Sequence, residues 1–297
     1  MKKTVVILVF LSIIFGEVKG QQYPALPVTD SSLLDKGFEF LIGAGAYFGN
    51  KYNASYYNGS PENTNNINYV LGNKYWYDEI YKIIVDKHPY VTDSVYLDQL
   101  PEDMKYSVSL SIALGLRYKF NKNWAISLTY SFTRLSATDV FTLKYNAPPG
   151  NMRNNYFPQH LIAKENRSVF DLAVSYLFHP HHMIKPYLEL GVQFNFVDVK
   201  KFFALIEEER QFTLLDYYNG ANYIPGVDMQ KYNTKFGGPG YGFSLAAGLK
   251  IVFNKYISID PVFYVSASSI NLKPYTDLAF NYGGYLRIVM SDHIFGK

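Results

Sequence analysis

The residues of this sequence that could do chemistry are eight charged side chains set inside otherwise apolar segments. They occupy alternate positions, opposite the large apolar residues, and comprise four acids and four bases: Glu39, Arg117, Lys119, Asp171, Glu189, Lys250, Asp260 and Arg287. If the segments are strands of one closed sheet, this small, polar face lines an interior. Buried charges must then pair, because an unpaired one is very costly. The pattern therefore predicts a ring of ion pairs in a lumen.

The order of the segments predicts which charges meet. The expected neighbours are Glu39 with Arg117 and Lys119, and Glu189 with Lys250, Asp260 and Arg287. An eight-stranded barrel leaves an interior only wide enough for side chains to fill. The favoured interpretation is a salt-bridged plug near the periplasmic end that does not conduct freely. A gated ion path and a proton relay are the alternatives.

Catalysis is a weaker interpretation of these residues. Two carboxylates that act on a sugar need an open cleft, which a filled lumen does not offer. Some small barrels modify lipid A with Ser/His chemistry, and the candidates here are His293, Ser266, Ser268 and Ser269. We expect the histidine at the periplasmic end of one strand and the serines at the outer end of another. The sequence therefore predicts a protein that is not an enzyme.

Metal and cofactor chemistry is not indicated either. The chain has no cysteine, which excludes thiolate metal sites and cysteine nucleophiles. His179, His181 and His182 could bind zinc or copper, but they surround Pro180 in a predicted turn with no adjacent carboxylate. An exposed polar turn is favoured, and no cofactor is expected. The net charge of +3, without a basic cluster among aromatics, argues against a nucleic-acid partner.

The segments that must position the charges alternate with period two. In 106–120, even positions are apolar and odd positions carry Ser, Ala, Gly, Arg or Lys. Such a run exceeds a usual globular strand and suits a tilted membrane strand. The same pattern recurs at about 38–48, 124–133, 170–178, 187–196, 241–253, 256–266 and 280–290. These are eight strands in all.

Apolar and polar residues also alternate in the strands of a soluble β-sandwich. The residues at the ends of the segments and on their polar face therefore decide between the two folds. The apolar faces are bounded by aromatic residues such as Phe38, Phe48, Phe120 and Trp124, as in the aromatic girdles of membrane barrels. The chain is 18% aromatic, with 28 tyrosines, and only 18% charged, against about 25% in soluble domains. The sequence predicts an all-β, eight-stranded antiparallel up-and-down transmembrane β-barrel.

The expected organisation is a signal peptide, a short segment and the barrel. Lys2 and Lys3 precede an apolar run at 4–15, which predicts a signal peptide over 1–20. A short periplasmic segment at 21–36 and the barrel domain at 37–297 follow. Short connections at 121–123, 179–185 and 254–255 alternate with large loops at 49–105, 136–166, 199–239 and 267–279. This asymmetry is typical of periplasmic turns and extracellular loops.

The first long loop is rich in Tyr and Asn. Its aromatic residues are Tyr52, Tyr56, Tyr57, Tyr69, Tyr75, Trp76, Tyr77, Tyr81, Tyr90 and Tyr96. Residues 76–87 have the apolar spacing of a short amphipathic helix, and 200–212 could be a helix or an extension of two strands above the membrane. The loop tyrosines either contact a protein or glycan or pack the loops into a cap over the barrel mouth.

Together, the signal peptide, the eight strands and the asymmetric connections resemble the OmpA/OmpX/OmpW-type small barrels. The Gln21-Gln22 start and the Tyr/Asn-rich loops resemble outer-membrane β-barrel proteins of Bacteroidota, including PorT-like proteins. The resemblance implies the outer membrane of a Gram-negative cell, contact with its lipid and lipopolysaccharide, and loops that bind a protein or glycan or join an envelope assembly. OmpW-like transport of small molecules and a lipid A-modifying enzyme are the alternatives. Many such chains end on an aromatic residue, whereas Gly296 and Lys297 follow Phe295 here.

Overall fold

The computed structural model describes residues 36–63, 65–148, 150, 153–215, 224–225, 235–254 and 256–292. The predicted signal peptide at 1–20, nearly all of the predicted segment at 21–36, and His293 lie outside these residues.

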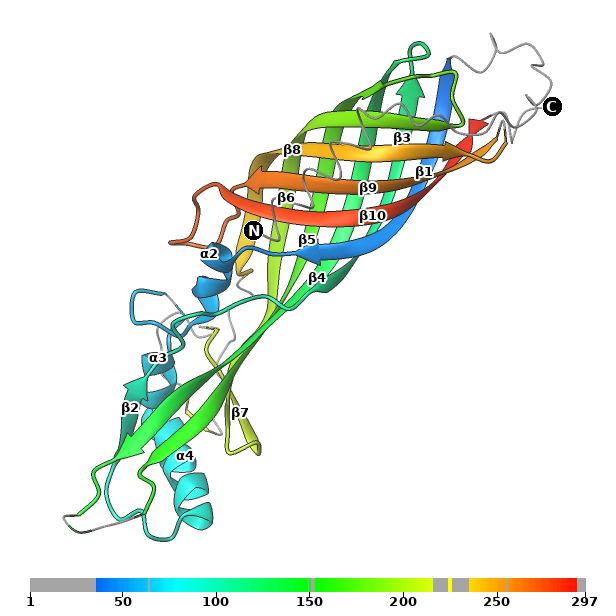
Figure 1. Cartoon of the computed structure of the whole chain (residues 1–297). Helices are drawn as coiled ribbons and strands as arrows, with labels where there is room; N and C mark the ends of the chain where they lie inside the picture. Colours follow the sequence, from blue (N-terminus) through cyan, green and yellow to red (C-terminus); the bar gives the residue numbers. More distant parts are fainter. Residues whose placement is uncertain are drawn as a thin grey trace.

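Eight antiparallel strands form a closed barrel (Figure 1). The strands are β1 (Gly37–Phe48), β3 (Ser109–Lys119), β4 (Trp124–Tyr145), β5 (Tyr156–Leu177), β6 (Ile184–Ile206), β8 (Gly237–Val252), β9 (Ile257–Ser268) and β10 (Ala279–Ser291). Each pairs with the next in the chain, and β1 pairs with β10 to close the ring. The predicted fold class is confirmed.

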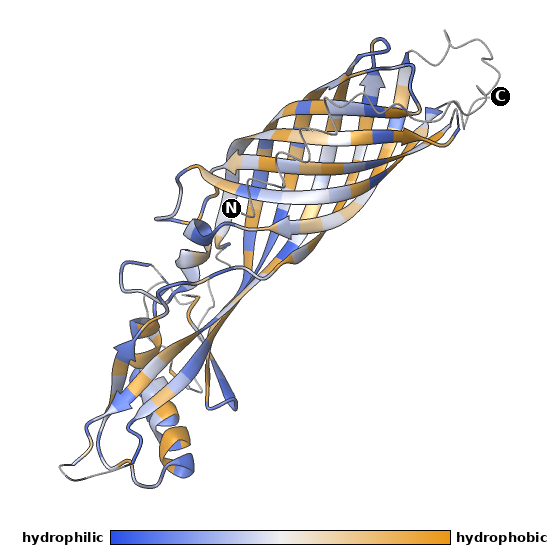
Figure 2. Ribbon diagram, in the orientation of Figure 1, coloured by the Kyte–Doolittle hydropathy of each residue, from blue (hydrophilic) through white to orange (hydrophobic). Residues whose placement is uncertain are grey.

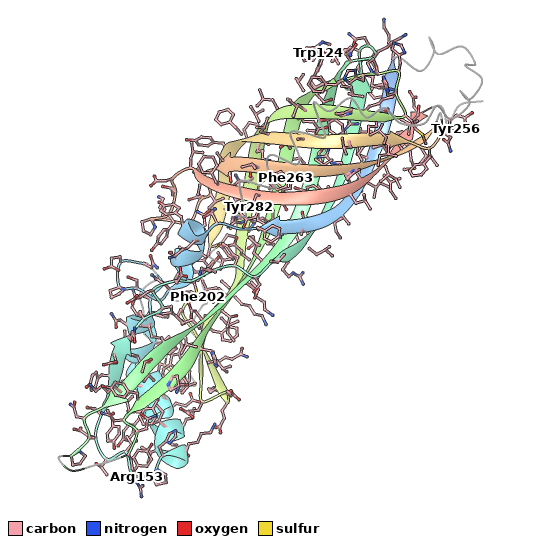
Figure 3. All side chains as sticks on the ribbon, viewed as in Figure 1. Trp124, Arg153, Phe202, Tyr256, Phe263 and Tyr282 are labelled. Atoms are coloured by element: carbon pink, nitrogen blue, oxygen red, sulfur yellow. The ribbon has the colours of Figure 1, made fainter. Side chains whose placement is uncertain are left out.

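The large apolar side chains point away from the barrel interior. Leu110, Leu128 and Val192 are 67%, 52% and 41% exposed, so they do not meet in a sandwich core. Figure 2 shows apolar and polar residues alternating along the barrel strands. In Figure 3, Phe263 and Tyr282 lie on the barrel wall, while Trp124 and Tyr256 lie at the short-turn end. A closed sheet with such a surface satisfies its backbone internally and meets lipid outside.

Three barrel strands continue well beyond the wall. β4, β5 and β6 have 22, 22 and 23 residues, whereas β1 and β3 have 12 and 11. Much of the predicted loops at 136–166 and 199–239 is therefore sheet, and those boundaries were wrong. For 200–212 the strand extension is the correct alternative, since β7 (Arg210–Thr213) folds back onto β6. The loop boundaries predicted from the sequence place the end of each strand at the edge of the membrane.

A folded head covers one face of the extended strands (Figure 1). It contains α2 (Lys51–Ala54), η2 (Ser55–Tyr57), α3 (Ile67–Leu71), α4 (Lys74–Lys87) and β2 (Val95–Gln99), together with β7 and the outer halves of β4, β5 and β6. The helix predicted at 76–87 is present as α4. No helix in the described part of the chain is long and apolar enough to cross a membrane.

The head has an apolar core separate from the barrel. In α4 the buried residues are Trp76, Ile80 and Ile84, at the spacing of one helix face. They pack with inward-facing residues of the extended strands, such as Phe141 and Phe202. The inward face of β4–β6 thus changes from lumen lining to head core, which explains why the alternation continues past the membrane.

Candidate functional site

Ion pairs around Arg117 fill the half of the lumen that is nearer the short turns. This side chain is 1% exposed and contacts three carboxylates. Its Nη2 lies 2.8 Å from Glu189 Oε1, and its Nη1 lies 3.4 Å from Glu39 Oε2 and 3.3 Å from Asp260 Oδ2. One guanidinium with several donors can bind several carboxylates at once, so Arg117 is the centre of the arrangement.

Three further bases surround this centre. Lys119 and Lys250 lie 3.1 and 2.5 Å from Glu39 Oε1, and Arg287 Nη1 lies 2.9 Å from Glu189 Oε2. We call this set the lumen charge network: Glu39, Arg117, Lys119, Glu189, Lys250, Asp260 and Arg287. The structure thus brings together seven of the eight residues singled out in the sequence.

The pairing inside the network differs from the expected one. Lys250 contacts Glu39 across the lumen and does not contact Glu189. In the sheet, Lys250 lies opposite Lys185, whereas Glu189 lies opposite Ala246, which is four residues from Lys250 along β8. Glu189 instead pairs with two arginines. Strand order predicts neighbours within the sheet, but side chains in a narrow barrel also meet across its interior.

The eighth residue, Asp171, lies apart from the network. It is opposite Gln193, whose Nε2 donates to Asp171 Oδ2 at 2.7 Å. Along the same two strands, Glu189 lies opposite Ser175, four residues nearer the short-turn end. Asp171 is therefore a polar lining residue of the middle lumen.

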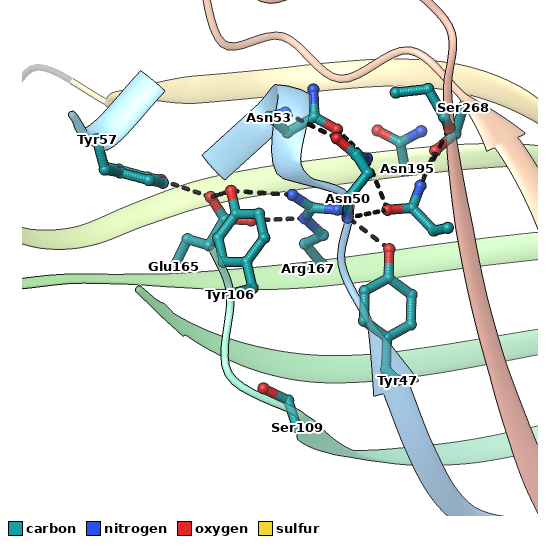
Figure 4. Close-up of polar contacts among 12 residues, drawn as sticks. Tyr47, Asn50, Asn53, Tyr57, Tyr106, Ser109, Glu165, Arg167, Asn195 and Ser268 are labelled. Atoms are coloured by element: carbon teal, nitrogen blue, oxygen red, sulfur yellow. Dashed lines mark hydrogen bonds and ion pairs between the residues drawn. The ribbon is translucent and has the colours of Figure 1, made fainter. Parts of the chain in front are cut away.

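A second buried cluster closes the outer mouth (Figure 4). Arg167 Nε lies 2.5 Å from Glu165 Oε1, and the other two guanidinium nitrogens donate to Tyr47 and Tyr106 at 3.1 and 3.2 Å. Tyr57 from η2 and Tyr106 both donate to Glu165 Oε2. We call these five residues the outer-mouth cluster.

Sequence reasoning missed this cluster. Glu165 falls in the predicted loop at 136–166, and Arg167 lies between that loop and the predicted strand at 170–178. Continuing the alternation from Asp171 back through Arg167 to Glu165 would have put both on the inward face. Burial and the neighbouring Glu165 carboxylate raise the pKa of Tyr57 well above its usual range, so its hydroxyl stays a donor.

Between the two closures lies a small cavity. It is lined by polar residues that include Thr129, Asp171, Gln193 and Ser244, with Arg167 at one end and Arg287 at the other. Its volume is about 50 Å³, and one water needs about 10–15 Å³. There is room for a few waters and not for a substrate.

The other candidate residues do not form a reactive site. Ser266 and Ser268 face inward near the outer end of β9, and Ser268 accepts a hydrogen bond from Asn281. Ser268 lies opposite Ala279, the first of thirteen residues in β10, which ends at Ser291. At about 3.3 Å per residue, the serines lie roughly a membrane thickness from Ser291, and His293 lies outside the described residues.

The turn histidines are also not assembled into a site. The rings of His179 and His182 are 5.6 Å apart in the turn between β5 and β6. Within the described residues, no group of three or more His, Asp or Glu side chains could hold a metal ion.

No protein-family model matches this chain, and no curated protein sequence matches it. It is similar to the solved structure of Neisserial surface protein A, with TM-score 0.41 and 9% identity over 86% of this chain and 96% of that one. OprG from Pseudomonas aeruginosa gives 0.34 and 12% over 86% and 94%. Ail of Yersinia pestis with the heparin analogue sucrose octasulfate gives 0.34 and 9% over 86% and 98%. Similarity at this level carries no argument about ligand or partner.

The architecture itself defines the class of protein. The barrel is closed, has an even number of antiparallel strands, and carries an apolar outer surface with short turns at one end and long segments at the other. These are the features of outer-membrane barrels. The chain is a small outer-membrane β-barrel with a head on the side of its long connections.

Proposed function

We propose that this protein is a non-enzymatic outer-membrane barrel that holds a folded extracellular head for binding at the cell surface. The observation that carries the proposal is the continuity of β4, β5 and β6 from the barrel wall into the head core. A rigid scaffold that presents a folded surface is a common basis for recognition. Because the lumen charge network and the outer-mouth cluster fill the lumen, the barrel serves as a support for the head.

Much of the Tyr/Asn-rich loop serves to fold the head. Tyr56, Tyr57 and Trp76 are buried, as are Asn63 and Asn73, which supports the interpretation of a cap over the mouth. Recognition then falls to the outward face of the extended sheet. Its exposed residues include Tyr96, Val140 and Tyr156, side chains of the kind that contact a protein or glycan.

The alternatives find less support. OmpW-like transport requires a path, while within the described residues the lumen is closed by the charge network and by the outer-mouth cluster. A lipid A-modifying enzyme requires a histidine near Ser266, Ser268 or Ser269, which lie at the opposite end of the barrel from Ser291, the last residue of β10. The narrower placement among PorT-like barrels of Bacteroidota rests on the Tyr/Asn-rich loops and is part of this proposal, as is a subunit role in an envelope assembly.

A photocrosslinking residue at Val140, incorporated in intact cells, tests the proposal. We expect an adduct of defined mass with a surface protein or glycan. Ala137, which is on the same strand and buried, is the matched control and should give none. The proposal is wrong if Val140, Tyr96 and Tyr156 all fail to give an adduct.

A further inference from the structure

Four basic side chains gather where β4, β5 and β6 leave the barrel wall. They are outward-facing and exposed, and we call them the cationic patch: Arg134, Lys164, Lys200 and Lys201. The lumen network and the head core use none of them.

A β-bulge concentrates the charge of β6. Val199 is opposite Glu165, whereas Lys201 is opposite Lys164, so one extra residue is inserted in β6 at this point. Val199 and Phe202 are both buried, and the two lysines between them are both exposed. A regular strand would turn one of the two inward, and bulges commonly re-aim side chains in this way.

The patch is short of negative charge. Lys164 and Lys201 are directly opposite each other on neighbouring strands, a destabilising arrangement for like charges. Lys200 pairs with Asp198, and Arg134 donates to the Asn166 side chain at 3.4 Å. Within the described residues, Arg134, Lys164 and Lys201 have no carboxylate partner. An external anion would relieve the repulsion.

The patch lies just above the lipid-facing wall. Phe132 on β4 and Phe196 on β6 flank Ser168 in an outward aromatic row on the barrel side of the patch. Arg134 is two residues further along β4, and Lys164 is four residues further along β5. At about 3.3 Å per residue, the bases stand about 7–13 Å beyond that row along the strands, which a strand tilt of about 35–45° reduces to a height of about 5–10 Å. This is the depth of lipid headgroups, since aromatic rings mark the membrane interface.

We propose that the cationic patch binds the phosphates of lipid A in the outer leaflet while the acyl chains contact the aromatic row below. The inference rests on the outer-membrane placement and orientation proposed above. A lipid is favoured over a soluble anion because phosphate and acyl chain would meet adjacent surfaces of the same three strands. Phe194 and Phe196 are 60% and 48% exposed immediately beneath the lysines.

The test uses the full-length mature protein in phosphatidylcholine vesicles that contain bisphosphorylated, monophosphorylated or dephosphorylated lipid A. The variant is Lys164→Gln with Lys201→Gln, and the control is Lys74→Gln with Lys82→Gln, two exposed lysines of α4. A lysine near an anionic surface contributes about 1 kcal/mol, or about fivefold in affinity. We expect binding that falls with loss of phosphate and weakens about 5- to 30-fold in the variant, with the control unchanged.

A second readout separates binding from folding. In neutral detergent the variant should unfold at the same or a higher temperature than the natural protein, because a like-charge pair is removed. With bisphosphorylated lipid A this order should reverse. The proposal is wrong if the Lys164/Lys201 variant binds lipid A as tightly as the natural protein does. It is also wrong if the Lys74/Lys82 control loses as much binding as that variant. Variant-sensitive binding of a soluble sulfated polysaccharide, with no preference among the lipids, would reassign the patch to a glycan.

Failure here is distinguishable from failure of the proposed function. The lipid experiment uses purified protein and needs no surface partner, while crosslinking at Val140 does not depend on lipid phosphates. Insertion into vesicles, scored by protease protection, checks the barrel itself.

Discussion

Tyr57 donates a hydrogen bond to Glu165 across 108 residues of sequence. The contact joins a one-turn helix of the head to a strand of the barrel. Glu165 also pairs with Arg167 and accepts a hydrogen bond from Tyr106. The head and the outer mouth therefore share one buried polar cluster. The packing of the head and the closure of the lumen are therefore coupled.

Tyr57→Phe should destabilise the docked head. The buried Glu165 carboxylate would lose one donor, which costs about 1–3 kcal/mol. Limited proteolysis of the protein in detergent should cut the head faster than in the natural protein. Tyr75→Phe, at an exposed position of α4, should leave the rate unchanged. Equal rates for both variants would contradict a structural role for the Tyr57–Glu165 bond.

Arg117→Met should be the most damaging change in the lumen. It leaves Glu39, Glu189 and Asp260 without their shared partner, and breaking a buried ion pair typically costs about 3–5 kcal/mol. Lys119→Met, at the more exposed margin of the network, should cost under about 1 kcal/mol. The free energy of unfolding in urea measures both. Similar costs would show that Arg117 is not the centre of the network.

Lys250→Met should lower the unfolding temperature because Glu39 loses its 2.5 Å partner across the lumen. Adding Glu39→Gln should recover part of the loss, whereas adding Glu189→Gln should not. This double-mutant comparison distinguishes the observed Lys250–Glu39 contact from the Lys250–Glu189 contact expected from strand order. Recovery only with Glu189→Gln would refute the observed pairing.

The lumen has two closures in series, so opening one should not make a channel. Planar-bilayer recordings of the natural protein should show no steady open conductance. Glu165→Ser with Arg167→Ser should stay closed, as should Arg117→Ser with Glu189→Ser. All four changes together should conduct, provided that heat-modifiable gel migration shows a folded barrel. Steady current through either two-residue variant would show that the other closure leaks.

The head should lose stability in strong alkali. Burial raises the pKa of Tyr56 to about 12, above the value of about 10 for an unfolded tyrosine. A raised pKa in the folded state contributes stability that is present below pH 10 and is lost as the pH rises towards 12. Unfolding of the head followed by Trp76 fluorescence should show this decline. Tyr56→Phe should make the decline shallower, and an identical slope would contradict the assignment.

The sequence was sufficient for the parts of the fold that follow from period two. Alternation identified the eight strands, the inward face and the charges on it, and it placed Glu39 beside Arg117, which are paired in the sheet. Helical spacing likewise identified α4. These features depend on residues near one another in the chain or on adjacent strands.

Features that depend on the far side of the barrel were not predictable in this way. The Lys250–Glu39 contact spans the lumen, and its geometry follows from strand tilt and side-chain length. The burial of Asn73 was also not evident, since asparagine is usually exposed. It is satisfied as the N-cap of α4, where its side chain accepts from Tyr75 and Trp76.

The uninterrupted passage of β4, β5 and β6 from wall to head has a mechanical consequence. A force that pulls the head away from the cell acts along these strands, so it loads many interstrand hydrogen bonds together in shear. A head on a loose tether would swing and would transmit force through one short segment. Here the whole β4–β5–β6 sheet carries the load into the membrane, which suits an attachment that must hold under drag.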